Sequence, residues 1–433
     1  MSLGVAAPGI LKTHITWNSI EESLQGALKT QATFGPAKDV ILLGDGEGFL
    51  SKIGLVNCDW QGMRNEERLP RRVVVKIASG LTAKKMEEKK IFAMPDDKDE
   101  IEKNWLNFES FLRETHNLES SAIYSFFKPF SDEVALANSY YCQAFTNQNL
   151  LEGQITLEYM ENAEIKNIYE YISLEQMKEV AKELGKIQAI AHKNNVIDVM
   201  EIKNKRDCYT APFGNFKFEL FVDMLRGFTI IDPSEHFKEL MDKVVGVAEE
   251  YFGANLPVTL HLQMGITPVL VNGDLWSANV MIDSETGNIR ALIDWQLAHL
   301  GCGAEDIYRI CFSGLSSRDR REHMDELLEI LYESLVEHME GQPAPYTIEQ
   351  LKYTSRILFP HFGFFFAQLH CPYSWFATMM NGDIDAEEKR KRTGIVLDKV
   401  RGIFEDILEY HEKNKLDETK YNWKQPDFWK ENH

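Results

Sequence analysis

The chain has 433 residues, and its 67 aspartates and glutamates outnumber 47 lysines and arginines to give a formal net charge of −20. This charge argues against a nucleic-acid backbone or an anionic membrane surface as a partner, because both would repel the protein. The composition, 44% hydrophobic and 26% charged, is that of a globular protein, and the length predicts two or three domains.

The cysteines and the most apolar segments exclude further classes of protein. The 6 cysteines are scattered without a Cys-x-x-Cys pair, which favours reduced thiols and gives no support for a zinc site. Residues 1–8 have no basic region or apolar run of signal-peptide length. Residues 357–367, the most apolar stretch, are interrupted by Pro360 and His361 and are too short to span a bilayer. We therefore expect a cytoplasmic protein that does not enter the membrane.

The first strands are expected to form a hairpin around three glycines. Residues 14–32 have the spacing of a short amphipathic helix, and residues 39–56 are predicted as strand, glycine turn and strand. Gly44, Gly46 and Gly48 let the backbone approach a ligand so that its N–H groups face phosphate oxygens. A dinucleotide-binding turn would pass into a helix, whereas this chain continues as strand. A flexible surface hairpin is the alternative.

The next predicted strand, residues 69–78, carries one lysine, Lys76, within a Val/Ile run. Such a lysine either protects an edge strand from pairing with another chain or reaches the α- and β-phosphates of a nucleotide. Because Lys76 follows the glycine hairpin, the second interpretation is favoured. Residues 81–104 are rich in charge and predict a solvated helix and loop.

A helix predicted for residues 105–127 contains three glutamates that can pair with Lys76, namely Glu109, Glu114 and Glu119. At about 100° per residue, Glu114 and Glu119 differ by roughly 140° and cannot both face the lysine. The apolar residues of this helix do not mark one clean stripe, so periodicity leaves the choice open.

Further elements follow in order. Strands are expected around Ala135 and at residues 140–145, and residues 154–162 pass from strand into a polar connector. The connector either offers backbone groups to an adenine or is a plain strand end. Ser173 with Gln176 predicts a capping box that opens a helix to about residue 194. A second helix is expected from residue 232 to residue 253, and helices dominate after residue 306, most strongly at residues 346–370 and 386–411. An aromatic tail covers residues 421–429.

The segment of residues 269–296 carries the catalytic chemistry. It is predicted as a short apolar strand, a polar loop and a hairpin, with Asp274, Asn279 and Asp294 at the ends of the strands. A kinase needs one carboxylate to take the proton of the attacking hydroxyl, and an Asn and an Asp to hold magnesium. Asp and Asn also occur at turns simply to bond their own backbone, which is the alternative.

The order of these motifs and the residues within them resemble those of one family. Asn272-Gly-Asp-Leu-Trp-Ser-Ala-Asn279 and Ile293-Asp-Trp-Gln296 are similar to the choline-kinase and aminoglycoside-phosphotransferase superfamily. Within it, the chain resembles the ecdysteroid-kinase-like (CHK-kinase-like) family, and its nematode members in particular. The segments that carry this finer likeness are Gly48-Phe-Leu-Ser51, Cys58-Asp-Trp60, Leu69-Pro70, Val75-Lys-Ile77 and His116-Asn-Leu-Glu119. The likeness covers residues 39–310.

The resemblance implies an α+β, bilobal, protein-kinase-like fold with ATP bound between its lobes. A small antiparallel-sheet lobe would cover residues 1–157 and a larger, mainly helical lobe residues 158–433. Asp274 would be the catalytic base, and Asn279 and Asp294 the Mg²⁺ ligands. Asp306 would be structural. The resemblance also implies the nucleotide-binding residues: Gly44, Gly46, Gly48 and Ser51 over the phosphates, Lys76 on the phosphates with Glu119 as its partner, and Glu158 and Met160 on the adenine through their backbone.

The function implied is an ATP- and Mg²⁺-dependent phosphotransferase acting on a hydroxyl of a small steroid-like or amino-alcohol acceptor. No Phe-Gly follows Asp294 and no activation segment is present, which disfavours a protein kinase. Asn272 stands where the superfamily usually has His, so a nucleotide-binding pseudokinase is the alternative. Five aromatic residues either form apolar walls of the acceptor site or pack in a helix core. They are Phe359, Phe362, Phe366, Tyr373 and Trp375. The oligomeric state is open.

Overall fold

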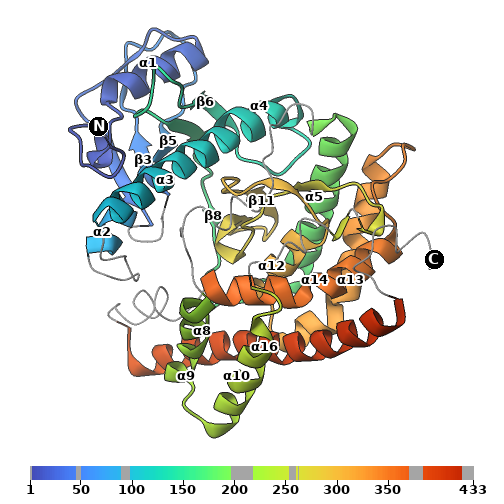
Figure 1. The fold of residues 1–433 in the computed structure, drawn as a ribbon. Helices are drawn as coiled ribbons and strands as arrows, with labels where there is room; N and C mark the ends of the chain where they lie inside the picture. Colours follow the sequence, from blue (N-terminus) through green and yellow to red (C-terminus); the bar gives the residue numbers. More distant parts are fainter. Residues whose placement is uncertain are drawn as a thin grey trace. The chain divides into compact units, whose positions relative to one another are not determined.

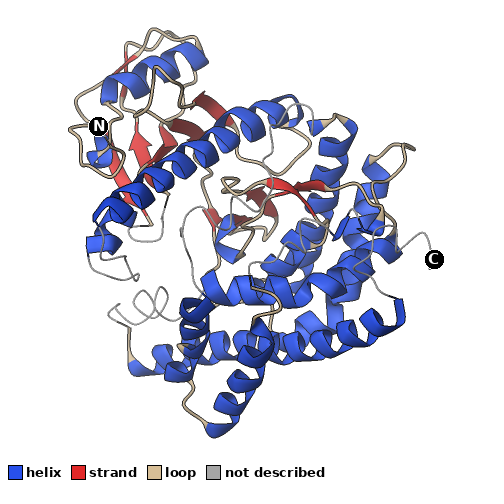
Figure 2. Ribbon diagram, viewed as in Figure 1, coloured by secondary structure: helices blue, strands red, loops and turns tan. Residues whose placement is uncertain are grey.

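The structure, a computed structural model, describes residues 2–44, 50–88, 98–196, 218–252, 260–261, 263–369 and 384–421. The chain divides into two compact units, one ending at Asn162 and the other beginning at Ala163 (Figure 1). The first unit is built on an antiparallel sheet, whereas the larger second unit is mainly helical (Figure 2). The predicted fold class is thereby confirmed.

A five-stranded antiparallel sheet organises the first unit, in the order β2-β3-β5-β7-β6. The β-branched strand β5 is central and pairs with β3 and β7. A small second sheet joins β1 and β4. The strands are β1 Thr33–Phe34, β2 Asp39–Leu43, β3 Ser51–Asn57, β4 Trp60–Gln61, β5 Arg72–Ala78, β6 Ser139–Gln143 and β7 Gln154–Glu158.

Helices cover both faces of this sheet. Val73, Val75 and Ile77 of β5 join a buried cluster with Ile20 and Leu24 of helix α1. Residues of a strand alternate between faces, and accordingly Ala78 packs with the opposite helix, α3. Lys76 is two residues before Ala78 in the strand, so its side chain lies on the same face, toward α3. The helical elements of this unit are η1 Ile10–Lys12, α1 Trp17–Leu28, α2 Leu81–Glu88, α3 Lys98–Asn117, η2 Leu118–Ile123, α4 Tyr124–Phe127 and η3 Lys128–Phe130.

The helix that carries the three glutamates changes its pitch. It begins at Lys98, earlier than predicted, and after Asn117 it passes through the π-helical segment η2 before α4 completes it. A π turn shifts the register of the residues that follow it, and such turns occur often at functional sites. The strand predicted around Ala135 is wrong, because the strand of this region, β6, begins at Ser139.

Two small sheets lie within the second unit. The hairpin of β10 and β11 was predicted, and β8 extends it to three strands. The predicted apolar strand β9 pairs with β12, which the sequence did not indicate. The strands are β8 Ala163–Glu164, β9 Val269–Val271, β10 Val280–Asp283, β11 Ile289–Leu292 and β12 His299–Gly301.

The helices of the second unit follow the prediction in most respects. The capping box of Ser173 and Gln176 opens α5, and Ser234 caps α10. Helix α10 ends at Ala248, before the predicted end at residue 253, which lies outside the described residues, as does the aromatic tail after Tyr421. The helices are α5 Leu174–Lys193, α8 Phe218–Arg226, α9 Phe228–Ile231, α10 Glu235–Ala248, α12 Glu305–Gly314, α13 Ser317–His338, α14 Ile348–Leu369 and α16 Ala386–Tyr421.

Aromatic side chains form the core of the helical unit. Phe359, Phe362 and Phe366 of α14 are 1%, 2% and 2% exposed and pack against Tyr308 and Phe312 of α12. Their burial supports the role of helix core rather than that of acceptor walls. Tyr373 and Trp375 lie outside the described residues. In the described part of the chain, no helix combines the length and apolarity needed to cross a membrane.

Candidate functional site

Lys76 is buried in the first unit and bound to Glu119. Its side chain is 6% exposed and that of Glu119 is 1% exposed. The Lys76 Nζ lies 2.7 Å from Glu119 Oε2 and donates to Glu119 Oε1 at 3.0 Å. Because β5 is paired on both sides, Lys76 does not protect a sheet edge, and that alternative is wrong. The predicted contact between Lys76 and Glu119 is confirmed.

The other two glutamates have different surroundings. Glu109 is buried, but its carboxylate accepts from the Leu3 N–H at 2.8 Å and pairs with Arg113 at 2.9 Å. Glu114 is exposed and accepts from the Ser110 hydroxyl at 3.3 Å. Glu119 differs from both because it lies in the π-helical segment η2. A uniform helical wheel could not have predicted this register.

The glycine hairpin is described only in part. Gly44, which follows β2, has a φ of +59°, a left-handed conformation that favours glycine. Gly46 and Gly48 lie outside the described residues. Ser51 opens β3, is buried, and pairs with Ala78 of β5. Roles of these residues on phosphates stay predictions.

The predicted adenine connector follows β7. Glu158 donates its backbone N–H to the Asn138 carbonyl at 2.9 Å, and its carboxylate accepts from Asn138 as well. The Glu158 N–H is therefore occupied. Met160 follows the strand and its side chain is buried. Contact of either residue with an adenine stays a prediction.

In the second unit, the loop between β9 and β10 holds Asp274 and Asn279. Asn279 ends the short helix η5, Ser277–Asn279, and its amide nitrogen donates to the Asp274 carbonyl at 2.8 Å. The Ile293 N–H donates to the Asn279 carbonyl at 2.9 Å. The first bond orients the side-chain amide and the second holds the backbone, so the side-chain oxygen is the atom that Asn279 can offer to a cation.

Asn272 connects the strand end to both acidic residues. Its side-chain oxygen accepts from the Asp274 N–H at 3.0 Å, and its amide nitrogen donates to the Asp294 carbonyl at 3.1 Å and the Ile293 carbonyl at 3.3 Å. The residue is 0% exposed. Asn can donate twice and accept at once, whereas a neutral His has one donor and one acceptor. Asn272 thus holds the loop through bonds of its own.

Asp306 anchors the same loop from helix α12. Its two carboxylate oxygens accept from the Asn272 N–H at 2.7 Å and the Gly273 N–H at 3.0 Å. Burial, with the charge of Glu305 beside it, raises the pKa of Asp306 to about 6 despite these bonds. Gly273 has a φ of +82°, and a Cβ there would lie 2.2 Å from the Leu297 carbonyl oxygen. The contacts agree with the structural role expected of Asp306.

Asp294 follows β11 with a strained backbone. Its φ is +58°, a left-handed conformation that non-glycine residues rarely adopt. Such outliers cost of order 1–3 kcal/mol and cluster at functional sites. Among the described residues, no group of three or more His, Cys, Asp or Glu side chains could hold a metal alone. Asp294 and Asn279 supply hard oxygen donors, which fit Mg²⁺ that is also held by nucleotide phosphates.

Sequence reasoning missed a buried polar cluster beneath this loop. His299 of β12 lies 3.3 Å from Glu305, which also pairs with Arg309 at 3.3 Å, and all three are at most 3% exposed. Ser313 accepts from the Ser277 N–H of the loop at 2.9 Å. No local pattern signals these contacts, since they join β12, α12 and η5 across the fold.

Comparison with known proteins gives the chain's relationships. Residues 3–415 match the DUF1679 family model, described as "Uncharacterized oxidoreductase dhs-27". The chain is 31% identical over 150 residues to "Uncharacterized kinase-like protein D1044.1" of Caenorhabditis elegans, a match that covers 34% of this chain and 39% of that protein. The match therefore spans about two fifths of the curated relative.

Solved structures of kinases are among the similar folds. A choline kinase from Cryptosporidium parvum has 12% identity and a TM-score of 0.42, covering 93% of this chain and 97% of its own. A microcompartment-associated aminopropanol kinase has 14% identity and a TM-score of 0.38, covering 90% and 97%. The family model, in contrast, matches nearly the whole sequence, and the chain belongs to the DUF1679 family.

Proposed function

We propose that the protein is an ATP- and Mg²⁺-dependent phosphotransferase that phosphorylates a hydroxyl of a small molecule. Asp274 is the base that takes the hydroxyl proton, and Asn279 and Asp294 hold magnesium. Lys76, oriented by Glu119, neutralises phosphate charge. The glycine hairpin with Ser51 covers the phosphates, and the backbone of Glu158 and Met160 receives the adenine. Asn279 and Asp294 would hold the Mg²⁺, which would supply positive charge to offset the negative charge of the phosphates.

The buried ion pair of Lys76 and Glu119 is the observation that carries the proposal. Removing two charges from water costs several kcal/mol per ion, and a well-packed apolar pair is often as stable. A lysine held in this way on the central strand of a sheet therefore suggests a task other than stability. A kinase uses such a pair to fix an ammonium group against nucleotide phosphates.

The name of the matching family model suggests an oxidoreductase, and the strand pairing argues against a dinucleotide fold. Every strand pair among the described residues is antiparallel. A Rossmann unit instead needs parallel strands joined through a helix that begins at the glycine turn. Here the glycine turn joins the antiparallel strands β2 and β3. The kinase-like name of the curated relative agrees with this view.

The acceptor is proposed to be a small steroid-like or amino-alcohol molecule, as in the ecdysteroid-kinase-like branch. The alternative is a nucleotide-binding pseudokinase, which the Asn272 substitution for the usual His favours. The bonds of Asn272 to Asp274 and Asp294 weaken that alternative, because the loop is held without a histidine. A phosphorylation screen of metabolite extracts with mass-spectrometric detection would identify the acceptor.

Replacing Asp274 with Asn tests the proposal directly. Loss of a positioned general base lowers turnover by about 10²- to 10⁴-fold, while nucleotide affinity should stay near that of the wild type. Turnover is measured as Mg²⁺-dependent phosphate transfer or ATP hydrolysis. The matched control is Asp283→Asn, since Asp283 ends the neighbouring strand and serves the hairpin turn. Equal turnover of Asp274→Asn and wild type would falsify the assignment, and absence of any turnover in the wild type would favour the pseudokinase.

A further inference from the structure

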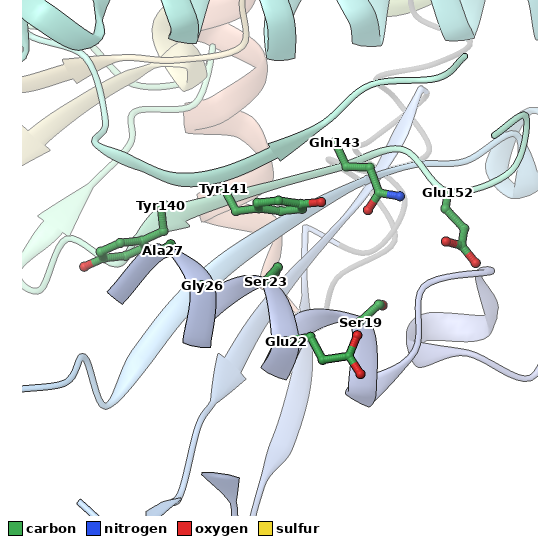
Figure 3. A pocket seen from close by; sticks show the side chains of 9 residues that line it. All are labelled: Ser19, Glu22, Ser23, Gly26, Ala27, Tyr140, Tyr141, Gln143 and Glu152. Carbon is green, nitrogen blue, oxygen red and sulfur yellow. The ribbon is translucent and has the colours of Figure 1, made fainter. Parts of the chain in front are cut away.

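A hollow of about 490 Å³ lies between helix α1 and strand β6 in the first unit (Figure 3). This volume is in the range of sites for small molecules. Two carboxylates and two tyrosines are among its nine lining residues, and no lysine, arginine or histidine is. We propose that the hollow binds an organic cation with a primary ammonium group and a short aliphatic body. The lining residues are Ser19, Glu22, Ser23, Gly26, Ala27, Tyr140, Tyr141, Gln143 and Glu152.

An irregularity in β6 builds the aromatic wall. The pairing of β6 with β7 runs from Ser139 opposite Leu157 to Tyr141 opposite Thr156, so β6 has one extra residue there. A bulge of this kind re-aims side chains. Tyr140 and Tyr141 are neighbours in sequence, and a regular strand would send them to opposite faces. Both nevertheless line the hollow beside α1.

The two ends of the hollow differ in chemistry. Figure 3 shows Glu22, Glu152 and Ser19 toward one end, with the Tyr140 ring beside Ala27 at the other. The carboxylates and the Ser19 hydroxyl can accept hydrogen bonds from an ammonium group. Tyrosine rings attract cations to their faces and also bury aliphatic groups. An amine with a short apolar body matches both ends.

A buried amide beneath the hollow is a separate sign of a ligand. Gln154 of β7 is 0% exposed, and its amide nitrogen donates to Ser23 of the lining at 3.2 Å and to Thr156 at 3.1 Å. Its side-chain oxygen has no hydrogen-bond partner among the residues that the structure describes. A buried polar atom left unpaired is costly, and native structures contain few. The amide nitrogen thus connects this buried side chain to the wall of the hollow at Ser23.

The hollow is distinct from the residues proposed to bind nucleotide. Gln154 pairs with Ile77 of β5 and therefore shares the α1 face of the sheet. Lys76 is adjacent to Ile77 in the strand, so its side chain lies on the opposite face, toward α3, where it pairs with Glu119. The proposal consequently does not rest on the phosphotransferase function, and binding can be measured without nucleotide.

Isothermal titration calorimetry of the full chain with n-hexylammonium chloride tests the site. We expect one saturable site, and about tenfold weaker binding of n-hexanol, which has the chain without the charge. Glu22→Gln and Glu152→Gln should each weaken binding of the amine by about three- to fivefold, as expected for exposed ion pairs. Both positions are on the surface of the unit, and circular dichroism confirms that the variants fold.

The control is Glu133→Gln, which makes the same change of charge at an exposed position outside the hollow. It should leave the affinity unchanged. If all three variants bind the amine equally, the net charge of the protein rather than the hollow attracts the cation, and the proposal fails. Equal affinity for n-hexanol and n-hexylammonium would also overturn it, because the carboxylates would then contribute nothing.

Discussion

At the scale of single residues, the buried ion pair of the first unit has the largest energetic consequences. Lys76 and Glu119 are almost fully removed from water and form a buried ion pair. His116 lies one helical turn before Glu119, and its Nε2 donates to the Gln143 carbonyl at 2.9 Å. The bond from His116 to Gln143 joins helix α3 to strand β6 close to the ion pair.

The Glu119→Gln variant should lose both stability and nucleotide affinity. The buried Lys76 ammonium would lose its carboxylate partner, and breaking a buried ion pair in this way costs about 3–5 kcal/mol. Urea unfolding and the KM for ATP measure the two effects. Glu114→Gln is the control, since Glu114 is exposed and should change stability by less than about 0.5 kcal/mol. If Glu119→Gln and Glu114→Gln had the same stability and the same KM for ATP, the ion pair would matter for neither property.

Acid should weaken the first unit through His116. Burial, followed by the charge of Lys76, lowers the pKa of His116 from 6.5 to about 4 although the bond to Gln143 opposes the shift. The unfolded chain therefore binds the proton more readily between these two pH values. The stability present above pH 6.5 is lost as pH falls toward 4, by about 3 kcal/mol for this group.

His116→Gln keeps a hydrogen-bond donor and removes the titration. Its free energy of unfolding, measured against urea from pH 7 to pH 4, should fall less steeply than that of the wild type. Parallel pH profiles for the two proteins would mean that His116 is not held neutral.

At the scale of elements, close approach of helices organises the second unit. A Cβ on Gly185 of α5 would lie 2.2 Å from the Leu331 carbonyl oxygen and 2.8 Å from the Leu335 nitrogen of α13. The two helix backbones therefore meet where α5 has no side chain. Gly246 of α10, in contrast, is exposed, and no described residue comes within 4 Å of such a Cβ.

This contrast predicts opposite effects of the same substitution. Gly185→Ala should destabilise the second unit by about 1–3 kcal/mol, because the helices must move apart. Gly246→Ala should stabilise it by about 0.5–1 kcal/mol, because alanine favours a helix. Thermal and urea unfolding of the two variants measure these changes in stability. A neutral Gly185→Ala would show that α5 and α13 separate at little cost.

At the scale of the whole molecule, the acidic net charge requires any nucleotide to be received by local cations and metal. A ligand that binds only the folded state stabilises it by mass action, by about 2.7 kcal/mol at one hundred times Kd. The antiparallel sheet of the first unit supports ATP over a dinucleotide as that ligand.

The melting temperature should accordingly rise with millimolar ATP and Mg²⁺ and stay constant with NADPH. ATP without Mg²⁺ should give a smaller rise, since Asn279 and Asp294 are proposed to bind the nucleotide through the metal. A rise with NADPH alone would reverse the preference for a kinase, and no rise with either ligand would remove the nucleotide hypothesis.

The sequence determined the features that depend on neighbouring residues. The capping box at Ser173, the hairpin of β10 and β11, and the strand around Lys76 were predicted correctly, because local propensity and turn chemistry specify them. The spacing of Asp274 and Asn279 identified a candidate site in the same way. Whether these residues catalyse phosphate transfer stays a prediction.

Only the tertiary structure decided the features that depend on distant pairing. It placed β5 at the centre of the sheet rather than at an edge, and it inserted the π-helical segment that brings Glu119 to Lys76. It also gave Asn272 its bonds to Asp294 and arranged α1 and β6 around a hollow. Such features arise where segments far apart in sequence pack together. Strand order, helix register and buried hydrogen bonds are set by that packing, and the conformational propensities of neighbouring residues do not determine it.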